Sequence, residues 1–364
     1  MSPVSSELNM KLAGLGYNED LSQYRQEHSL HSFEIGRVIA EHRERYIVLT
    51  EKGEMDAEII GHLRFSASDR SDFPAVGDWV ALSVFNEDEA IIHAIYPRQS
   101  VLERQAVGKF GEKQIIATNI DYALIIQAVK RDFNLNRLER YLAISYAGNI
   151  EPVIILSKID LVGQDELSSI VNEVSKRIKD VQIIAISNIS RDGFDLLIQI
   201  LQEGKTYCFL GSSGVGKSTL INNLAGKDLM RTNSISDSTN KGRHVTSHRE
   251  MHVLESGAIL IDNPGMREIG MADSDGGMEA TFDTIINLSK TCKFSDCKHI
   301  HENGCAVLEA LEDGEIERAY YENYLKMERE KIHFTSSIAE KRRKDKEFGK
   351  MVKTFKKNKK QSKM

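Results

Sequence analysis

The feature that most constrains this 364-residue sequence is one run, Gly211-Ser212-Ser213-Gly214-Val215-Gly216-Lys217-Ser218, which matches G-x-x-x-x-G-K-[ST] in full. Glycines at these positions let the backbone curl so that successive N–H groups point inward at phosphates. The apolar run Thr206 to Leu210 precedes it, and Thr219 to Leu224 has the pattern of a helix whose positive end adds to the attraction. The pattern predicts a nucleotide phosphate loop in which Lys217 reaches the β- and γ-phosphates and Ser218 ligates Mg²⁺.

A second phosphate motif, Asp262-Asn263-Pro264-Gly265, ends the apolar run that begins at Ala258. At such a strand end, Asp262 is expected to hold Mg²⁺ through water, and the N–H of Gly265 to sense the γ-phosphate. Asp-x-Pro-Gly alone is a common turn sequence. Its position about 50 residues after the phosphate loop, at the end of a strand, favours the functional interpretation.

The residues Ser157-Lys158-Ile159-Asp160 follow another apolar run and are similar to the [NT]-K-x-D pattern that recognises guanine. An aspartate at the last position accepts the N1 and N2 protons of guanine, which adenine does not offer, while the lysine stem lies over the base. Ser157 stands where that pattern has Asn or Thr, which shortens one polar contact. Ser187, after the strand expected at Gln182 to Ile186, fits the loop that supports the base from the other side. Together these residues favour GTP over ATP.

The order of these motifs is unusual, because the base motif precedes the phosphate loop by more than 50 residues. The parts still meet in space if the sheet is circularly permuted, a rearrangement that a domain with neighbouring termini tolerates. The mobile segments around Thr246 and Gly265 then lie late in the domain. Movement there on hydrolysis would act directly on whatever follows.

A first switch loop is expected around Gly242-Arg243-His244-Val245-Thr246, between the two phosphate motifs. Thr246 offers a second hydroxyl ligand for Mg²⁺. His244 is a candidate for orienting the attacking water when a partner orders the loop, and a plain surface histidine is the alternative interpretation. Met266 follows Gly265 where many GTPases have a water-positioning Gln, and a thioether cannot orient water. We therefore expect slow hydrolysis by the isolated protein.

Three of the four cysteines crowd into a short segment, with Cys292, Cys297, His299 and Cys305 spaced as C-x4-C-x-H-x5-C. Three thiolates and one imidazole predict a closed tetrahedral Zn²⁺ site with a structural role. His301 is an alternative fourth ligand. The fourth cysteine, Cys208, lies in an apolar run and is expected to be a buried thiol.

The pattern of apolar and charged residues changes along the chain and divides it into five parts. The first three are a flexible arm over 1–32, an OB-fold β-barrel over 33–104, and an α/β GTPase domain with a mostly parallel sheet over 105–281. A helical zinc-binding domain over 282–340 and a basic tail over 341–364 follow. The alternating runs at 37–40, 46–49, 79–82 and 90–95 predict barrel strands. Tyr320 and Tyr324 share a helix face, and packing is favoured over RNA stacking.

The basic tail carries 12 Lys and Arg and two acidic residues, a charge of +10, so the rest of the chain is −16 when the whole is −6. Such a tail contacts polyanions or stays solvated without a partner, and the sequence does not decide between the two. With neither a membrane-length apolar run nor a secretory signal, we expect a cytoplasmic protein, monomeric and without a membrane contact.

The combination of barrel, permuted GTPase domain and Cys3His module resembles the RsgA family, also called YjeQ or YloQ. The resemblance rests on Gly77-Asp78-Trp79-Val80, Asn119-Ile120-Asp121, Ser157 to Asp160, the phosphate loop, Gly242-Arg243-His244, Asp262 to Gly265 and Cys292 to Cys305. It implies GTP hydrolysis stimulated by the small ribosomal subunit, contact with its rRNA, and a role late in its maturation. Two positions depart from the family pattern, Ser157 and Val245, and the second leaves Thr246 as the only hydroxyl ligand in the switch.

Two other classes of function share part of this motif pattern. A small-molecule kinase or ATPase is disfavoured by Asp160 and by the absence of a further substrate motif. An RNA-binding scaffold that uses GTP as a conformational ligand, with little turnover, would carry the same motifs. Phosphate release with and without small subunits separates the scaffold from the enzyme.

Overall fold

The structure is a computed structural model that describes residues 12–42, 45–67, 69–86, 88–105, 113–130, 133–229, 250–262, 276–334 and 343. Within these ranges the chain forms two compact units. The larger takes in everything up to Asp283 except residues 104–114, and the smaller takes in residues 104–114 and those from Thr284 onward. None of the helices in the described part of the chain has both the length and the apolar character needed to cross a bilayer.

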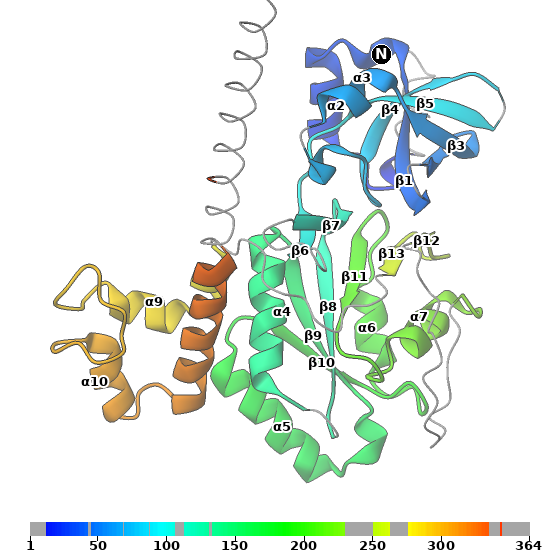
Figure 1. The fold of residues 1–364 in the computed structure, drawn as a ribbon. Coiled ribbons are helices and arrows are strands. Elements are labelled where there is room, and N and C mark those ends of the chain that lie inside the picture. The colour runs from blue at the N-terminus through cyan, green and yellow to red at the C-terminus, as the bar shows by residue number, and fades with distance from the viewer. Residues whose placement is uncertain are drawn as a thin grey trace, which may run out of the picture. The chain divides into compact units, whose positions relative to one another are not determined.

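A five-stranded closed barrel begins the larger unit (Figure 1), as the alternating apolar runs predicted. Its strands are β1 (Glu34–His42), β2 (Arg45–Thr50), β3 (Gly53–Ile59), β4 (Trp79–Val84) and β5 (Glu89–Ile95). They pair in the order β1-β2-β3-β5-β4, and β4 returns to β1 to close an OB-like barrel. The inward side chains, among them Val38, Val48 and Leu82, form one apolar cluster. The short helix α3 (Gly61–Ser66) and the 3-10 turn η2 (Arg70–Asp72) lie between β3 and β4.

The second part of the larger unit is a mostly parallel sheet, drawn from cyan-green at β8 to yellow at β12 and β13 in Figure 1, with strand order β10-β9-β8-β11-β13-β12. Its strands are β8 (Tyr122–Ala128), β9 (Glu151–Ser157), β10 (Gln182–Ile186), β11 (Thr206–Leu210), β12 (Glu250–Val253) and β13 (Ile259–Asp262). Only β12 runs antiparallel, against β13. The central strands are almost continuously apolar and buried, as a sheet covered on both faces requires.

Helices connect these strands: α4 (Leu135–Ala147), α5 (Gln164–Arg177), α6 (Phe194–Ile200) and α7 (Lys217–Ala225). The Asn134 side chain caps α4 by accepting from the N–H of Arg137, and α5 has acidic residues in its first turn and basic ones in its last. Residues of α6 and α7, including Leu197 and Leu220, pack on one apolar face of the sheet. Because parallel crossovers are right-handed, α4 and α5, met on the way outward from β8 to β10, belong to the opposite face.

This topology contains the point where the strand order reverses. The chain runs outward from β8 through β9 to β10 and then returns, so that β11 pairs with β8 on one side and β13 on the other. In sheets of this kind ligands bind at the carboxyl ends of the strands, beside the reversal. The loops that follow β9, β11 and β13 therefore meet at one edge, whatever their order along the chain.

The barrel is tied to the sheet around the buried side chain of Arg37. Its guanidinium donates to three carbonyl oxygens from separate segments, those of Leu15 (2.6 Å), Gly77 (3.2 Å) and Asn119 (2.9 Å). Burial lowers the pKa of Arg37 to about 10, a shift that Asp121 opposes, so it keeps its charge at neutral pH. One residue pair, Ala40 with Glu250, also joins β1 to β12, so barrel and sheet are continuous. The ribbon β6 (Val101–Gln105) and β7 (Lys113–Thr118) follows β5.

The expectation of a flexible arm over residues 1–32 is wrong for its described part, residues 12–32. Helix α2 (Glu19–Glu27) is capped by Asn18, and a 3-10 turn, η1 (Leu30–Ser32), follows it. Leu12, Tyr17 and Leu21 are buried, and the Tyr17 ring packs edge-on against Trp79 with centroids 5.2 Å apart. Residues 1–11 lie outside the described residues.

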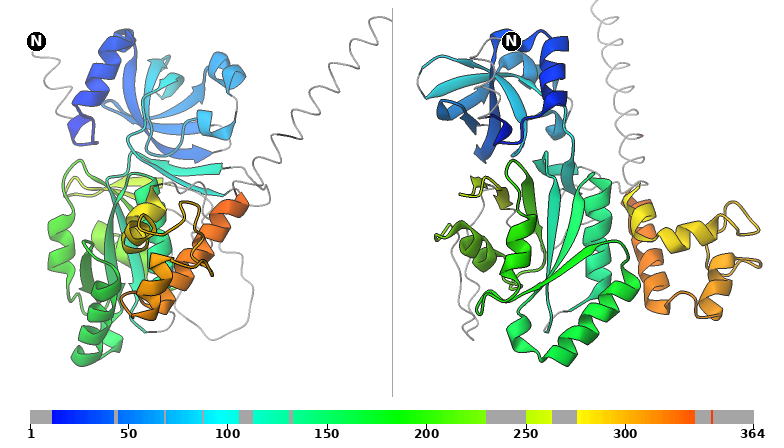
Figure 2. Two further views of the ribbon diagram at one scale, coloured as in Figure 1. Left: turned by 90° about the vertical axis from the view of Figure 1, so that its left-hand side faces the viewer. Right: turned by 180° about the vertical axis from the view of Figure 1, so that it is seen from behind.

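The smaller unit holds most of α9 (Asp283–Ser289), together with α10 (Ala306–Glu312) and a helix over 318–334, shown in yellow to orange in Figure 2. Tyr320 and Tyr324 on the last helix are 7% and 8% exposed, so they are packed against other parts of the chain rather than presented to an external base. Val307 and Met327 are fully buried. A core this small is poorly stabilised by apolar burial alone.

Gly77 provides a stability test of the barrel–sheet connection. Its φ of +96° favours glycine, and an added Cβ would overlap the carbonyl oxygen of Thr118. We expect Gly77→Ala to lower the free energy of unfolding by about 3 kcal/mol. Gly53→Ala is the matched control, because Gly53 has φ +120° with no atom within 4 Å of an added Cβ. Gly53→Ala should lower the free energy of unfolding by about 1 kcal/mol, because it adds only the conformational strain. Denaturant unfolding measures both, and equal losses would contradict the proposed overlap.

Candidate functional site

The phosphate loop follows β11 and leads into α7, as the sequence predicted for residues 206–224. Gly211, Gly214 and Gly216 all have positive φ, at +149°, +81° and +102°. A Cβ at Gly211 would overlap the carbonyl oxygen of Ile126 at the end of β8, so only glycine lets the loop turn this tightly against the sheet. Lys217 folds back over the loop, and its ammonium donates to the carbonyl oxygens of Gly211 and Ser212, each at 2.7 Å.

The base motif lies against this loop. Ser157 ends β9 and is fully buried, and its hydroxyl donates to the carbonyl oxygen of Val215 at 2.7 Å, across 58 residues of sequence. Lys158, at φ +62°, turns the chain into the 3-10 turn η3 (Ile159–Leu161), which contains Asp160. The sequence suggested a polar contact from Ser157 to the base. The structure instead has its hydroxyl directed at the loop, joining the two motifs.

A third segment, the loop after β10, completes the cluster. The Ser187 hydroxyl donates to an Asp160 carboxylate oxygen at 2.5 Å, and the Asn188 side chain donates to the carbonyl oxygen of Gly216 at 3.2 Å. Asn223, on α7, donates in turn to the carbonyl oxygen of Asn188 at 3.1 Å. The base motif, its supporting loop and the phosphate loop are therefore one hydrogen-bonded assembly.

Asn223 was not identified from the sequence, because one of two adjacent asparagines in an ordinary helix carries no recognisable pattern. Asn188 adjoins the predicted Ser187, but its contact with the phosphate loop had no local signal either. Both roles depend on a contact between distant segments.

Asp262 is the last residue of β13, beside β11, and is 8% exposed. At that position it belongs to the same carboxyl edge as the loops that follow β9 and β11. Ser218 lies in the first turn of α7 and is half-buried. The predicted residues His244, Val245, Thr246, Gly265 and Met266 lie outside the described residues.

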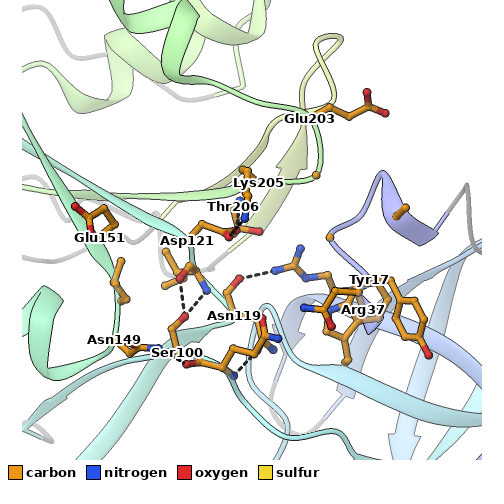
Figure 3. A pocket seen from close by; sticks show the side chains of 18 of the residues that line it. Tyr17, Arg37, Ser100, Asn119, Asp121, Asn149, Glu151, Glu203, Lys205 and Thr206 are labelled. Atoms are coloured by element: carbon orange, nitrogen blue, oxygen red, sulfur yellow. Dashed lines mark hydrogen bonds and ion pairs between the residues drawn. The ribbon is translucent and has the colours of Figure 1, made fainter. Parts of the chain in front are cut away.

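The cavity of about 500 Å³ in Figure 3 lies at the other end of these strands. It is lined by residues just before β8, by residues at the starts of β9 and β11, and by barrel residues such as Arg37 and Trp79, and none of the nucleotide motif residues lines it. Its polar groups bond one another: Lys205 pairs with Asp121 at 2.7 Å, and the N–H of Thr206 donates to the same carboxylate at 2.8 Å. The cavity is part of the barrel–sheet connection and is separate from the phosphate loop.

The predicted metal ligands converge in the smaller unit. The Cys292, Cys297, His299 and Cys305 ligand atoms all lie within 4.8 Å of one another. His299 Nδ1 is 3.6 Å from Cys292 Sγ and 3.3 Å from Cys305 Sγ, and those two sulfurs are 3.9 Å apart. The alternative ligand His301 is exposed and is not part of the cluster.

The donor set fits Zn²⁺. Tetrahedral zinc with ordinary bond lengths places two sulfurs about 3.8 Å apart, and a sulfur and a nitrogen about 3.6 Å apart. The distances in the cluster lie close to both values, and four protein donors leave no open position for chemistry. The ion would hold together loops that lack a large core.

The loop that presents His299 is organised around Glu302, a residue that sequence reasoning missed. Hydrogen bonds from the backbone N–H groups of His301, Ile300 and Lys298 lower the pKa of Glu302 to about 2. The Tyr321 hydroxyl donates to the His299 carbonyl oxygen at 2.5 Å, which ties the loop to the helix over 318–334. These contacts shape the ligand loop from outside the metal cluster.

A parallel sheet that brings a phosphate loop, an Asp at the end of the neighbouring strand and a guanine-type motif to one edge, in permuted order, defines a circularly permuted P-loop GTPase.

Comparisons with known proteins agree with this class. The family model described as RsgA GTPase matches residues 95–272. The chain is 45% identical to the small ribosomal subunit biogenesis GTPase RsgA 1 of Listeria innocua over 295 residues, 81% of this chain and 83% of that one. It is 38% identical to the Bacteroides thetaiotaomicron protein of the same name, covering 97% and 99% of the two chains.

Solved structures show the same fold. The crystal structure of YjeQ from Thermotoga maritima aligns with a TM-score of 0.61 at 25% identity, covering 82% of this chain and 98% of that one. YloQ, described as a circularly permuted GTPase, aligns with a TM-score of 0.60 at 25% identity, covering 86% and 98%. The chain belongs to the RsgA GTPase family. It is accordingly a GTP hydrolase, with guanine nucleotide and Mg²⁺ as the ligands that the family implies.

The bond from Ser157 to Val215 gives a test of the assembled site. Ser157→Ala leaves the buried Val215 carbonyl without this donor and should weaken GDP binding about fivefold, the effect of one ordinary hydrogen bond. Ser169→Ala, an exposed serine on α5, is the control and should bind GDP like wild type. Titration with a fluorescent GDP analogue measures both. Unchanged affinity in Ser157→Ala would show that this bond does not organise the site.

Metal content tests the cysteine cluster. Purified protein should contain about one Zn²⁺ per chain, and Cys297→Ser should reduce this to near zero, because three remaining ligands bind a structural ion poorly. Cys208→Ala removes a buried cysteine outside the cluster and should keep the full zinc content. Elemental analysis of the three proteins measures their zinc content. Wild-type protein without zinc would refute the assignment of the cluster as a zinc site.

Proposed function

We propose that this protein binds the small ribosomal subunit and hydrolyses GTP to GDP and phosphate in a subunit-stimulated manner, acting late in maturation of that subunit. The observation that carries the proposal is the bond between Ser157 and Val215, which joins guanine and phosphate motifs into one site. Relatives named small ribosomal subunit biogenesis GTPase that align over most of this chain supply the partner.

The roles proposed for the nucleotide residues follow their positions. Asp160 accepts the guanine N1 and N2 protons, Lys158 lies along the base, and Ser187 orients the Asp160 carboxylate through their bond. Ser157 acts by positioning the phosphate loop. The phosphates bind Gly211, Ser212, Ser213, Gly214, Val215, Gly216, Lys217, Ser218 and Thr219, and Gly265 senses the γ-phosphate. Mg²⁺, held by Ser218, Thr246 and Asp262, would neutralise charge on the β- and γ-phosphates.

Lys217 has to move when nucleotide binds. Its ammonium donates to the carbonyl oxygens of Gly211 and Ser212. A phosphate would replace these two oxygens as the acceptor of its hydrogen bonds. Because Met266 stands where many GTPases have a water-orienting Gln, the isolated protein is expected to hydrolyse GTP slowly. His244 is proposed to orient the attacking water once a partner orders its segment.

The remaining parts are assigned to partner binding. The barrel over 33–104 and the zinc domain over 282–340 flank the GTPase domain over 105–281 in sequence. With the basic tail over 341–364 they are proposed to contact rRNA, while the structural Zn²⁺ at Cys292, Cys297, His299 and Cys305 holds the zinc domain. The protein is proposed to act as a cytoplasmic monomer.

The rate of GTP hydrolysis with increasing small subunits tests this function. We expect slow turnover alone and a rise of at least tenfold with subunits. The stimulation should weaken as salt rises, because displaced counterions of rRNA phosphates contribute to binding. Large ribosomal subunits are the matched control. Binding to small subunits without faster turnover would favour a scaffold that uses GTP as a conformational ligand.

Asp160→Asn tests guanine recognition. An amide offers one acceptor and one donor where the carboxylate offers two acceptors, so the guanine N2 protons meet an N–H group. We expect GDP affinity to fall by about 100-fold or more and xanthosine diphosphate, whose position 2 carries an oxygen, to bind better than GDP. Asp165→Asn, on exposed α5, should bind both like wild type. An unchanged preference for GDP in Asp160→Asn would remove Asp160 from the base site.

A further inference from the structure

Side-chain hydrogen bonds join the base motif, the loop after β10 and the phosphate loop to one another in pairs. The Ser157 hydroxyl joins the base motif to the phosphate loop at Val215. The Ser187 hydroxyl joins the loop after β10 to the base motif at Asp160. Because a hydroxyl group has a single proton to donate, each serine makes one of these connections. The third connection, between the loop after β10 and the phosphate loop, is made by another side chain.

Asn188 makes this third connection. Its Nδ2 group donates to the carbonyl oxygen of Gly216 at 3.2 Å. The two residues are so close that a Cβ added to Gly216 would lie 2.8 Å from Nδ2. Gly216 is the N-cap residue of α7, which begins at Lys217. Asn188 therefore contacts the phosphate loop where it turns into the helix whose positive end attracts phosphates.

Asn188 is held in turn by the side of α7. The side-chain amide of Asn223 donates to both the carbonyl oxygen and the side-chain oxygen of Asn188, at 3.1 and 3.3 Å. Arg191, from the same loop as Asn188, donates to the carbonyl oxygen of Asn223 at 3.5 Å. Gly216 and Asn223 lie about two turns apart along the helix. The loop after β10 therefore contacts α7 over its first two turns, which fixes the direction of the helix as well as its start.

The same loop holds the base motif at its other end. The Ser187 hydroxyl accepts from the N–H groups of Ile189 and Ser190, at 3.2 and 3.1 Å, while it donates to Asp160. The loop is therefore a compact, internally bonded turn. Because Ser187 and Asn188 are adjacent in this turn, a shift of one displaces the other.

We propose that Asn188 is a positioning residue for guanine nucleotide binding, which keeps the base motif and the phosphate loop at a fixed separation. It acts on Asp160 through Ser187 and on the start of α7 through Gly216, and Asn223 holds it in place. Since guanine and the phosphates belong to one ligand, a looser separation weakens the contacts at both ends. The inference rests on the proposed function, in that Asp160 must bind the base and the phosphate loop the phosphates.

Two ratios of affinity test this role. The affinity for GDP relative to inosine diphosphate reports the Asp160 contact, because inosine lacks the N2 amino group. The affinity for GDP relative to GMP reports the contacts of the second phosphate. In Asn188→Ala we expect GDP to bind about tenfold more weakly and both ratios to fall about threefold. Asn172→Ala, an exposed asparagine on α5, is the control and should keep both wild-type ratios. Competition with a fluorescent GDP analogue measures all three nucleotides.

The two ratios separate a coupled role from a local one. A fall in both supports the proposal. A fall in the ratio of GDP to GMP alone would show that Asn188 acts on the phosphate loop only. A fall in the ratio of GDP to inosine diphosphate alone would show that it acts on the base motif only. Either of these results, or two unchanged ratios, would overturn the proposal.

Asn223→Ala tests the same role with the Asn188 side chain intact. We expect about threefold weaker GDP binding, again with both ratios lowered. The double variant should lose less than the product of the two single losses, because the two side chains share one set of contacts. Losses that multiply would contradict that sharing.

The Asn223 variant also guards against a folding defect. Should Asn188→Ala lose its cooperative unfolding transition, the two ratios in Asn223→Ala decide alone: a fall in both supports the proposal, and any other result overturns it. A wild-type protein that binds no guanine nucleotide would contradict the proposed function instead.

Discussion

The meeting of strand ends at one edge of a parallel sheet is the constraint on which the rest of this structure depends. The Ser157 hydroxyl and the Val215 carbonyl oxygen, 58 residues apart in sequence, are 2.7 Å apart because β9 and β11 both end there, on either side of β8. Chain order is irrelevant to such a meeting. A permuted sequence therefore builds the same kind of pocket as an unpermuted one.

Permutation nevertheless changes what the site is connected to. The strand β12, which begins directly after residues 230–249, lies at the edge of the GTPase sheet and pairs with barrel strand β1 through Ala40 and Glu250. Arg37, on the same barrel strand, donates a hydrogen bond to the carbonyl oxygen of Asn119 in the segment that leads into β8. The barrel is thereby joined both to the start of the sheet and to the strand that follows the expected first switch.

Much of the site could be predicted from the sequence, because the phosphate loop, Asp262, Asp160 and the cysteine cluster are local patterns with a chemical cause. The strand at 182–186 was also predicted with correct bounds, and the apolar run at 206–210 coincides with β11, since both segments are strongly apolar. The structured segment over 12–32 was missed, because the burial of Leu12, Tyr17 and Leu21 depends on contacts with the barrel. The contacts of Ser157, Asn223 and Glu302 are likewise tertiary and leave no local pattern.

The central claim, that one pocket binds guanine and phosphate through motifs in reversed order, is tested most directly by an experimental structure with GDP and Mg²⁺ bound. The account predicts the Asp160 carboxylate within hydrogen-bonding distance of guanine N1 and N2, and the Lys217 ammonium on the β-phosphate of the same molecule. A nucleotide seated on Lys217 with its base remote from Asp160 would contradict it.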